Sequence, residues 1–259
     1  MSDKELIFAF GRTGSKARLR NKIYNMMPKD FKTYVEPFVG GGSVYLGYKF
    51  KPGQRAVLND KDKTLMGAWR ILKNPPKNVN WRQYDTENLS KLQSLADSTS
   101  SSPAAKLVKQ IVLSRNTFSG KGVGKIYRTI NPYGKLKNID DYEAKLKNAT
   151  LLNKDVGAVI SSYDNPNNFF YFDPPYEETA TQGKLYEHGD FNLERFAKRL
   201  KTMKAKFLLS LNDSPNVRKL FSGFKIRGFT QVAQGNQGAS GAMANIGSKP
   251  RKEVLISNY

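Results

Sequence analysis

Short apolar runs and amphipathic segments alternate over the first quarter of the chain. Residues Thr33–Val39 and Gln54–Leu58 have the apolar and aromatic content of strands, while Ser43–Phe50 and Lys63–Leu72 have the character of helices. The helical spacing is clearest in the last of these segments, where one face carries Leu65, Met66, Trp69 and Leu72. A strand, a glycine turn, a helix and a second strand predict a βαβ unit and therefore a parallel sheet.

The same alternation resumes near Thr150 and continues to the end of the chain. Strands are predicted at Phe169–Phe172, Lys206–Leu211 and Glu253–Ser257, and helices at Leu193–Leu200 and Val217–Phe221. Between them, residues 234–248 are Gly, Ala, Asn, Gln and Ser with almost no core-forming side chains. We expect a mobile loop there.

The middle of the chain has a different character. Residues 77–104 are polar and end in the Ser/Thr tract Ser98–Pro103, which we interpret as a loop. Lys106–Leu113 is a short helix candidate, and the Gly-, Lys-, Arg- and Tyr-rich residues 114–138 predict a flexible hairpin. The sequence contains no internal repeat. The prediction is one α/β domain of residues 1–69 and 149–259, interrupted by a basic insert at 70–148.

Composition narrows the partners. Among 259 residues, 43 lysines and arginines outnumber 22 acids, giving a net charge of +21 and a pI near 9.9. Such a charge favours a polyanion, with nucleic acid ahead of anionic lipid. We expect a soluble, intracellular protein with no membrane partner, because no apolar run reaches transmembrane length and the charged start is no signal peptide.

Cysteine and histidine are nearly absent, which excludes several chemistries. Zero cysteines exclude disulfides, thiolate catalysis and thiolate zinc sites. The single histidine, His188, precedes Gly189 and is interpreted as an exposed loop residue. One histidine argues against a Ser-His-Asp triad or a histidine metal cluster, and we expect no metal.

The most informative segment is the end of the aromatic run at 168–176. Asp173-Pro174-Pro175-Tyr176 stops the strand, because proline has no backbone N–H and restricts the residue before it. The Asp173 carboxylate, nearby carbonyls and an aromatic ring are therefore expected at the strand's carboxyl end. Such acceptors beside an aromatic face suit a flat base that bears an amino group. The alternative is a proline-terminated strand with a solvated acid.

A glycine turn follows the first strand. Gly40-Gly41-Gly42 lets the backbone approach a ligand at a helix N-terminus, and Asp60 lies 18 residues after Gly42, where an acid can hold ribose hydroxyls. NAD and S-adenosylmethionine are both candidates. Tyr45 replaces the third glycine of the dinucleotide fingerprint, which favours the cofactor without a pyrophosphate. The alternative is a tight turn with a helix-capping aspartate.

Together, these segments resemble the Dam-type (D12 class) DNA adenine N6-methyltransferases. The resemblance rests on Asp173–Tyr176 and Val35–Val44, and extends in order along nearly the whole chain to Arg12–Lys16, Asn59-Asp60, Lys154-Asp155, Ser210–Asp213 and Lys252–Ser257. It implies a Rossmann-like S-adenosylmethionine-dependent sheet with an inserted, mainly helical target-recognition domain that carries a β-hairpin. The substrate would be double-stranded DNA and the cofactor product S-adenosylhomocysteine.

The resemblance also implies roles for individual residues. The target base would meet Asp173, Pro174, Pro175 and Tyr176. The cofactor would contact Phe10, Arg12, Gly14, Lys16, Glu36, Phe38, Gly40, Gly42, Ser43, Asp60, Asp155 and Asp173. Among them, Lys16 and the turn would face its methionine part, Asp60 its ribose and Asp155 its adenine. Arg12 departs from the pattern, since the family usually has an aromatic residue there, and Phe10 could substitute for it.

The chemistry explains the strand-end motif. The exocyclic amine of adenine is a poor nucleophile because its lone pair is delocalised, and hydrogen-bond acceptors for both amino hydrogens favour the reactive pyramidal nitrogen. Asp173 would accept one hydrogen and the Pro174 carbonyl the other, with Tyr176 stacked on the base. In duplex DNA the base must first be flipped out, at a cost of roughly a few kcal/mol.

The insert offers candidate DNA contacts. Residues 106–147 hold ten lysines and arginines against three acids, interleaved with aromatic residues. Such side chains can position phosphates, read base edges or fill the space of a displaced base. The candidates are Arg115, Asn116, Lys121, Lys125, Tyr127, Arg128 and Tyr133.

The same residues are compatible with other functions. The same pocket could methylate RNA adenine or a protein glutamine amide, although enzymes of the latter kind favour Asn at the position of Asp173. A catalytically inactive DNA-binding module is a further alternative, suggested by Arg12. The expected protein is a monomer that acts on cytoplasmic DNA, and a virus or mobile element could encode it. Its recognition sequence, for which GATC is only a guess, and any companion restriction enzyme are left open.

Overall fold

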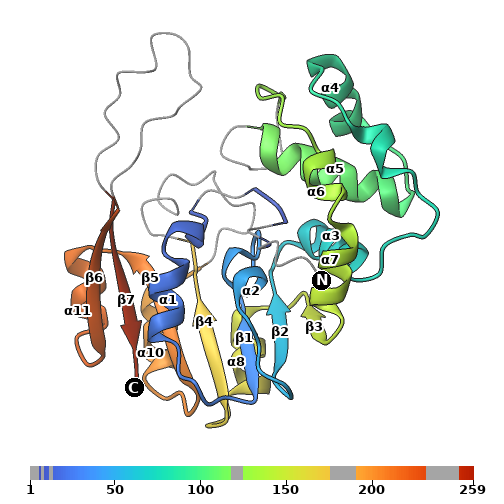
Figure 1. Cartoon of the computed structure of the whole chain (residues 1–259). Coiled ribbons are helices and arrows are strands. Elements are labelled where there is room, and N and C mark those ends of the chain that lie inside the picture. The colour runs from blue at the N-terminus through green and yellow to red at the C-terminus, as the bar shows by residue number, and fades with distance from the viewer. Residues whose placement is uncertain (1–5, 7–8, 12–13, 118–124, 176–190, 232–250) are drawn as a thin grey trace.

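The computed structural model describes residues 6, 9–11, 14–117, 125–175, 191–231 and 251–259. Its centre is a seven-stranded sheet in the order β3-β2-β1-β4-β5-β7-β6 (Figure 1). The strands are β1 (Thr33–Glu36), β2 (Arg55–Asn59), β3 (Ala149–Leu152), β4 (Asn168–Phe172), β5 (Lys206–Asn212), β6 (Lys225–Gln231) and β7 (Arg251–Ser257). The strands from β3 to β5 are parallel, and β7 runs antiparallel to both β5 and β6.

Apolar alternation places a hydrophobic layer on each face of the sheet. In β4, Phe169 and Tyr171 belong to one layer and Phe170 and Phe172 to the other, as period-two geometry requires. The first layer is covered by α1 (Arg20–Met26), α2 (Ser43–Gly47) and α3 (Lys63–Lys73). The second is covered by α8 (Val156–Tyr163), α10 (Leu193–Leu200) and α11 (Pro215–Leu220). A short 3-10 helix, η1 (Lys16–Arg18), precedes α1.

Between β2 and β3 the chain forms a helical insert. After α3 come η2 (Trp81–Tyr84), α4 (Leu89–Asp97), α5 (Pro103–Asn116), α6 (Tyr133–Leu136) and α7 (Ile139–Leu146). Ser102 caps α5 by accepting from the N–H of Ala105, with Pro103 in the first turn, which is a favoured helix start. Buried Leu107, Ile111 and Tyr142 join the same hydrophobic cluster as the α1–α3 layer, so the insert shares a core with the sheet.

The structure confirms the predicted βαβ unit, the helix at 63–72 and the strands at 169–172 and 206–211. The predicted loop at Ser98–Pro103 was wrong at its last residue, because Pro103 begins α5. The prediction of a hairpin across 114–138 was also wrong in its described parts. Residues 114–116 end α5, 125–130 form no strand, and α6 begins at Tyr133.

Some sequence predictions concern residues outside the described ones, and one predicted domain boundary falls inside a helix. His188, most of the predicted hairpin tip and residues 234–248 lie outside the described residues. The helix α3 continues through Lys73, so the boundary placed at 69/70 falls inside a continuous helix, and the first break in regular structure follows at Asn74. In the part of the chain that the structure describes, no helix is long and apolar enough to span a bilayer.

Candidate active site

Acidic residues line the carboxyl edge of four adjacent parallel strands. Asp173 follows β4, Glu36 ends β1, Asp60 follows β2, and Asp155 lies three residues beyond β3. Because the strand order is β3-β2-β1-β4, these four acids form a row along one edge of the sheet. Ligands of open parallel sheets bind outside this edge. A row of carboxylates in a protein of charge +21 therefore marks this edge as chemically distinct.

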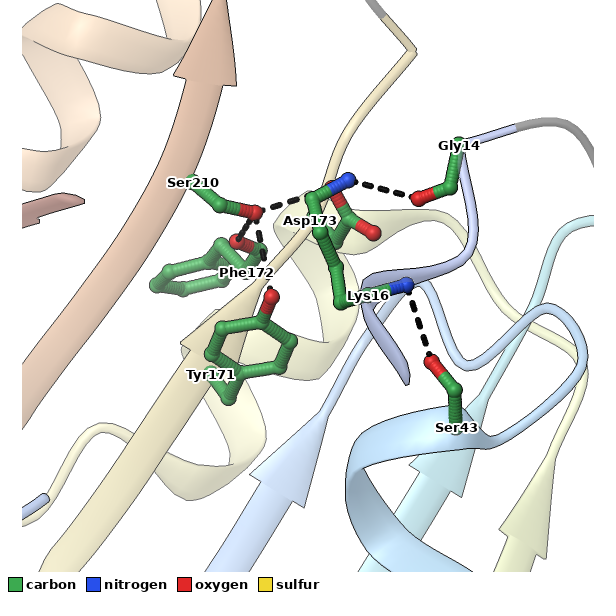
Figure 2. Close-up of polar contacts among 7 residues, drawn as sticks. All are labelled: Gly14, Lys16, Ser43, Tyr171, Phe172, Asp173 and Ser210. Atoms are coloured by element: carbon green, nitrogen blue, oxygen red, sulfur yellow. Dashed lines mark hydrogen bonds and ion pairs between the residues drawn. The ribbon is translucent and has the colours of Figure 1, made fainter. Parts of the chain in front are cut away.

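Asp173 is held by a buried lysine from the N-terminal segment. The Lys16 side chain is 2% exposed, and its Nζ lies 2.8 Å from Asp173 Oδ1 (Figure 2). The same Nζ donates to the carbonyl of Gly14 at 2.7 Å, and Gly14 has a φ of +86°. A buried charge requires such a partner set. Lys16 therefore joins the N-terminal loop to the end of β4.

A second contact to Asp173 comes from the next strand. Ser210 of β5 is fully buried, and its Oγ lies 2.9 Å from Asp173 Oδ1 and 3.1 Å from the hydroxyl of Tyr171. The Phe172 carbonyl is 3.4 Å from the same Oγ. Beyond Asp173, Pro174 is buried and Pro175 is half-buried. The proline pair thus ends β4 against packed structure.

The glycine turn is shaped by its neighbours within the protein. A Cβ on Gly41 would lie 2.1 Å from the carbonyl oxygen of Phe10, and one on Gly42 would lie 2.5 Å from the Trp69 ring. Gly40 and Gly42 have φ of +47° and +74°. Phe10 is buried and contacts Trp69 edge to face at 5.5 Å. These positions require glycine because the N-terminal segment and α3 close on the turn.

Asp60 braces the turn from β2. Its Oδ2 accepts from the N–H of Gly40 at 3.0 Å, and its Oδ1 accepts from the N–H of Asp62. The Gly40 carbonyl accepts from Trp69 Nε1 at 3.0 Å. Buried Asn59 donates to the carbonyls of Pro37 and Lys154, so β1, β2 and the segment after β3 are tied together.

Glu36 is a buried acid within this framework. It is 2% exposed, and Tyr34 donates a hydrogen bond to its Oε2 at 2.8 Å. Burial raises the pKa of Glu36 well above its usual value; the nearby charges of Asp173 and Asp60 add to the rise, and hydrogen bonds from Tyr34 and the Tyr45 backbone oppose it. A cationic group bound at this edge would lie near the Glu36 carboxyl and the neighbouring acids Asp60 and Asp173.

The other cofactor candidates differ in placement. Ser43 begins α2, and its Oγ accepts from the N–H of Lys16 at 3.2 Å, so the turn and the lysine segment meet directly. Phe38 instead packs on the opposite layer of the sheet, with ring centroids 5.6 Å from Phe191 and 6.2 Å from Phe196. Asp155 is exposed and caps α8 through the N–H of Gly157. Arg12 and Tyr176 lie outside the described residues.

Among the candidate DNA contacts of the insert, Asn116 is buried and holds the backbone, whereas Tyr127 and Arg128 are exposed. Asn116 is fully buried; its amide donates to the Ile130 carbonyl and accepts from the Ile130 N–H at 2.6 Å. Its backbone carbonyl accepts from the N–H groups of Tyr127 and Arg128. Tyr127 is 47% exposed, and the Arg128 guanidinium lies 5.1 Å from its ring centroid. In this arrangement Asn116 supports the segment that exposes the other two.

The remaining insert candidates occupy different environments. Lys125 is exposed, and Tyr133 is half-buried against the core. Arg115, at the end of α5, is half-buried, and burial lowers the pKa of its guanidinium. A Cβ on Gly11 would lie 3.3 Å from Arg115 Cγ, so this arginine lies where the insert meets the N-terminal segment. Lys121 is outside the described residues.

Three residues that hold the site together were not among the predicted site residues. Ser210 was recognised only as part of a motif, and Tyr171 and Trp69 only as strand and helix residues. The available signal was a serine flanked by Leu209 and Leu211 in a buried strand, since a buried hydroxyl needs a partner. Which partner it finds depends on strand order, which a single sequence leaves open.

Comparison with known proteins identifies the family. Residues 13–232 match the family model described as D12 class N6 adenine-specific DNA methyltransferase. The type II methyltransferase M.MjaIII of Methanocaldococcus jannaschii is similar, with 28% identity over 95% of this chain and 96% of that protein. The type II methyltransferase M.CviBI of Paramecium bursaria Chlorella virus NC1A is 23% identical, over 82% of this chain and 85% of its own.

Similarity to a solved structure is weaker. The crystal structure of precorrin-6y C5,15-methyltransferase from Geobacter metallireducens aligns with a TM-score of 0.42 and 8% identity, over 99% of this chain and 92% of its own. The family model, in contrast, spans most of the chain and both central motifs, and it confirms the resemblance drawn from the sequence. The chain belongs to the D12 class N6 adenine-specific DNA methyltransferase family.

Proposed function

We propose that this protein transfers a methyl group from S-adenosylmethionine to the exocyclic amine of an adenine in duplex DNA, after that base has been flipped into a pocket at Asp173. The observation that carries the proposal is the placement of Asp173. Its carboxylate stands at the end of β4, fixed by Lys16 and Ser210, directly beside the strand that leads into the glycine turn.

The residues at this edge fit the proposed cofactor. S-adenosylmethionine supplies an electrophilic methyl group on a sulfonium, and it also carries an ammonium group and ribose hydroxyls. The acids in the row are suited to these groups, because carboxylates accept hydrogen bonds and favour nearby cations. We assign Glu36, the 40–43 turn and Lys16 to the methionine part, Asp60 to the ribose and Asp155 to the adenine. Phe10, beside the turn, is the aromatic candidate in place of Arg12.

The target amine would be handled by Asp173 and the prolines. An ionised carboxylate only accepts hydrogen bonds, so Asp173 can take one amino hydrogen while the Pro174 carbonyl takes the other. The nitrogen lone pair would then be directed away from the ring and toward the sulfonium methyl. As the N–C bond forms, the C–S bond would break, S-adenosylhomocysteine would leave with its electrons, and the methylated nitrogen would lose one proton to solvent. Tyr176 would stack on the base. The acceleration comes from positioning and electrostatics, and Asp173 need not remove a proton before attack.

We assign the helical insert, residues 70–148, to DNA recognition. The exposed side chains of Lys125, Tyr127 and Arg128 lie on one short segment that Asn116 holds against α5. Lysine and arginine can neutralise phosphates, and an exposed aromatic ring can occupy the space of a displaced base. In this proposal Asn116 supports the contact surface and touches no base itself.

A methylation assay tests the function. Purified protein is incubated with unmodified duplex DNA and S-adenosylmethionine, and the nucleosides are then analysed by mass spectrometry. N6-methyladenine is expected with the wild type and not with Asp173→Ala, while Asp164→Ala, in the loop between α8 and the opposite end of β4, should remain active. A wild type that binds DNA but forms no methyladenine would favour the inactive DNA-binding module. Methylation of RNA in preference to DNA would also overturn the proposal.

A further inference from the structure

Ser210 is a fully buried polar residue of the sheet. It is 0% exposed and lies in the middle of β5, where its strand neighbours Leu209 and Leu211 belong to the apolar layer on the other face. Its own side chain points to the face that carries Tyr171, and Figure 2 shows Ser210, Tyr171 and Asp173 converging at the end of β4. A buried hydroxyl is destabilising unless it is hydrogen-bonded, so these partners account for its presence.

Proton counting gives the hydrogen bonds a direction. The ionised carboxylate of Asp173 can only accept, so the Ser210 hydroxyl must donate its single proton to Oδ1 at 2.9 Å. That leaves Ser210 only as an acceptor toward Tyr171, whose hydroxyl at 3.1 Å must then donate. The competing acceptor, the Phe172 carbonyl, is farther away at 3.4 Å. The chain therefore runs from Tyr171 through Ser210 to Asp173.

These hydrogen bonds determine which oxygen of the Asp173 carboxylate is available to accept a hydrogen bond from the substrate. Ser210 Oγ and Lys16 Nζ both contact Oδ1, at 2.9 and 2.8 Å. Within the described part of the structure, the contacts of Asp173 all involve Oδ1, while 21% of its side chain remains exposed. Two donors on Oδ1 fix the rotation of the carboxylate, and Oδ2 is the oxygen that neither of them occupies.

We propose that Ser210 is a positioning residue for methyl transfer, which holds the Asp173 carboxylate so that Oδ2 accepts a hydrogen bond from the target amine. Tyr171 supports Ser210 by donating to it. This inference rests on the proposed role of Asp173 as the acceptor of an amino hydrogen. Lys16 cannot replace the serine, because its Nζ also holds Gly14 and approaches from the N-terminal loop, whereas Ser210 belongs to the rigid strand beside β4.

The first test compares two serines buried in the same sheet. Ser210→Ala removes the hydroxyl beside Asp173, and Ser257→Ala removes a hydroxyl in β7 that is 3% exposed and donates to the Tyr259 carbonyl. Single-turnover methylation at saturating cofactor and DNA is measured on protein shown by circular dichroism to be folded. We expect Ser210→Ala to lower the rate about 10- to 100-fold, as misplacement of a reacting group does, and Ser257→Ala to match the wild type.

Two further variants separate positioning from stability. Ser210→Thr keeps a hydroxyl and should recover most of the rate, whereas Ser210→Cys nearly keeps the volume but has a weak donor and should not. Tyr171→Phe also removes a buried hydrogen bond but leaves Ser210 free to donate to Asp173. It should lower the thermal midpoint as Ser210→Ala does, with a smaller loss of rate. Cofactor affinity, measured by calorimetry, should change less than threefold in all of them.

The outcomes distinguish this inference from the proposed function. If the wild type forms methyladenine and folded Ser210→Ala is equally fast, Ser210 has no positioning role, and the proposed function stands. The inference also fails if Ser210→Ala and Tyr171→Phe lose rate only in proportion to lost stability. If the wild type itself forms no methyladenine, the proposed function fails first.

Discussion

At the scale of single residues, the site depends on one contact between distant parts of the sequence. Lys16 and Asp173 are 157 positions apart in sequence, yet their charged atoms lie 2.8 Å apart. Both side chains are largely removed from solvent, with 2% and 21% exposed. Charged partners in such surroundings interact more strongly than surface pairs, and loss of one leaves the other poorly solvated.

Lys16→Met tests this contact. The variant keeps the buried aliphatic volume but loses the side-chain bonds to Gly14 and Asp173. The carboxylate then keeps only Ser210, while the backbone bonds of the N-terminal segment to Ser43, Gly41 and Ser114 remain. We expect the single-turnover methylation rate to fall about 10- to 100-fold, because the carboxylate is no longer fixed in place. The matched control is Lys22→Met on the exposed side of α1, which should retain the wild-type rate. An equal loss in both variants would contradict the assigned role of Lys16.

At the scale of elements, the N-terminal segment is wedged between the glycine turn and the insert. Its Ala9 N–H donates to the Gly41 carbonyl at 2.9 Å, and its Gly11 N–H donates to Ser114 Oγ of α5 at 3.2 Å. A Cβ on Gly11 would lie 2.5 Å from the Ser114 carbonyl oxygen. The segment therefore packs against both the candidate cofactor turn and the end of α5. A displacement of the turn should consequently shift the end of α5, and the reverse.

Gly41→Ala tests this packing. The added methyl would lie 2.1 Å from the backbone oxygen of Phe10, which no side-chain rotation can relieve. We expect the free energy of unfolding to fall by about 2–3 kcal/mol, in the range of overpacked sites, with weaker binding of S-adenosylmethionine in calorimetry. Gly67→Ala within α3 is the control. Its added methyl meets nothing within 4 Å, so better helix propensity should stabilise the protein by about 0.5–1 kcal/mol.

The elements also show how far the sequence could lead. The helix at 63–72 and the aromatic strand at 169–172 were predictable, since periodicity and the proline stop are local signals. The helix α1 was missed because its Arg20–Met26 sequence mixes charged, polar and apolar residues without a clear stripe. In 114–138, glycine and lysine content favoured a hairpin, whereas the described residues on either side are held by long-range packing of Leu136, Ile139 and Tyr142.

The site was predictable to a similar extent. Asp173, Lys16, Ser43 and the glycine turn were identified, and the structure brings them together. The direct contact of Lys16 with Asp173, and the role of Ser210 beside it, depend on β1, β4 and β5 being neighbours, which is a property of the whole sheet. Asn116 was taken for a DNA contact because its residue type suits base edges, while its buried amide is occupied by Ile130.

At the scale of the whole molecule, the helical insert is docked onto the sheet domain through α7. The Lys145 carbonyl accepts from the Tyr45 hydroxyl at 2.6 Å, and Lys145 Nζ donates to the carbonyl of Tyr48. The same Nζ lies 5.5 Å from the Tyr45 ring centroid and 5.1 Å from that of Phe50. Tyr45 belongs to α2, which begins at the glycine turn, so the docking of the insert and the candidate cofactor site share an element.

Charge on the insert should also determine how DNA binding depends on salt. Arg128→Gln removes one exposed cation from the 125–130 segment, so a lost phosphate contact should reduce the slope of log affinity against log salt by about 1. The slope is measured by fluorescence anisotropy with duplex DNA at salt concentrations from about 50 to about 200 mM, a range over which counterion release changes the affinity strongly. Lys106→Gln, an exposed cation at the other end of α5, is the control. Equal slopes for all three proteins would remove Arg128 from the DNA surface.

The docking of α7 should also respond to pH in a defined direction. Burial lowers the pKa of Lys145 to about 8, whereas an unfolded chain holds its lysines near about 10.4. Between these values the unfolded chain binds more protons, so the contribution of Lys145 to the free energy of unfolding rises with pH. Below about pH 8 both states are charged, and the cost of burying the ammonium is present in full.

Lys145→Met removes this dependence and leaves that of Lys135, whose pKa is also lowered to about 8, unchanged in both proteins. The wild type should therefore gain stability relative to the variant as pH rises from about 8 to 10, the window bounded by the folded and unfolded pKa values. Urea unfolding across this range measures the difference. Burial raises the pKa of Tyr45, so the ring beside Lys145 stays neutral. Lys147→Met, at an exposed position two residues along, should follow the wild type at every pH. A difference between wild type and Lys145→Met that stays constant with pH would mean that Lys145 keeps its proton in the folded protein and that the insert docks without sensing pH.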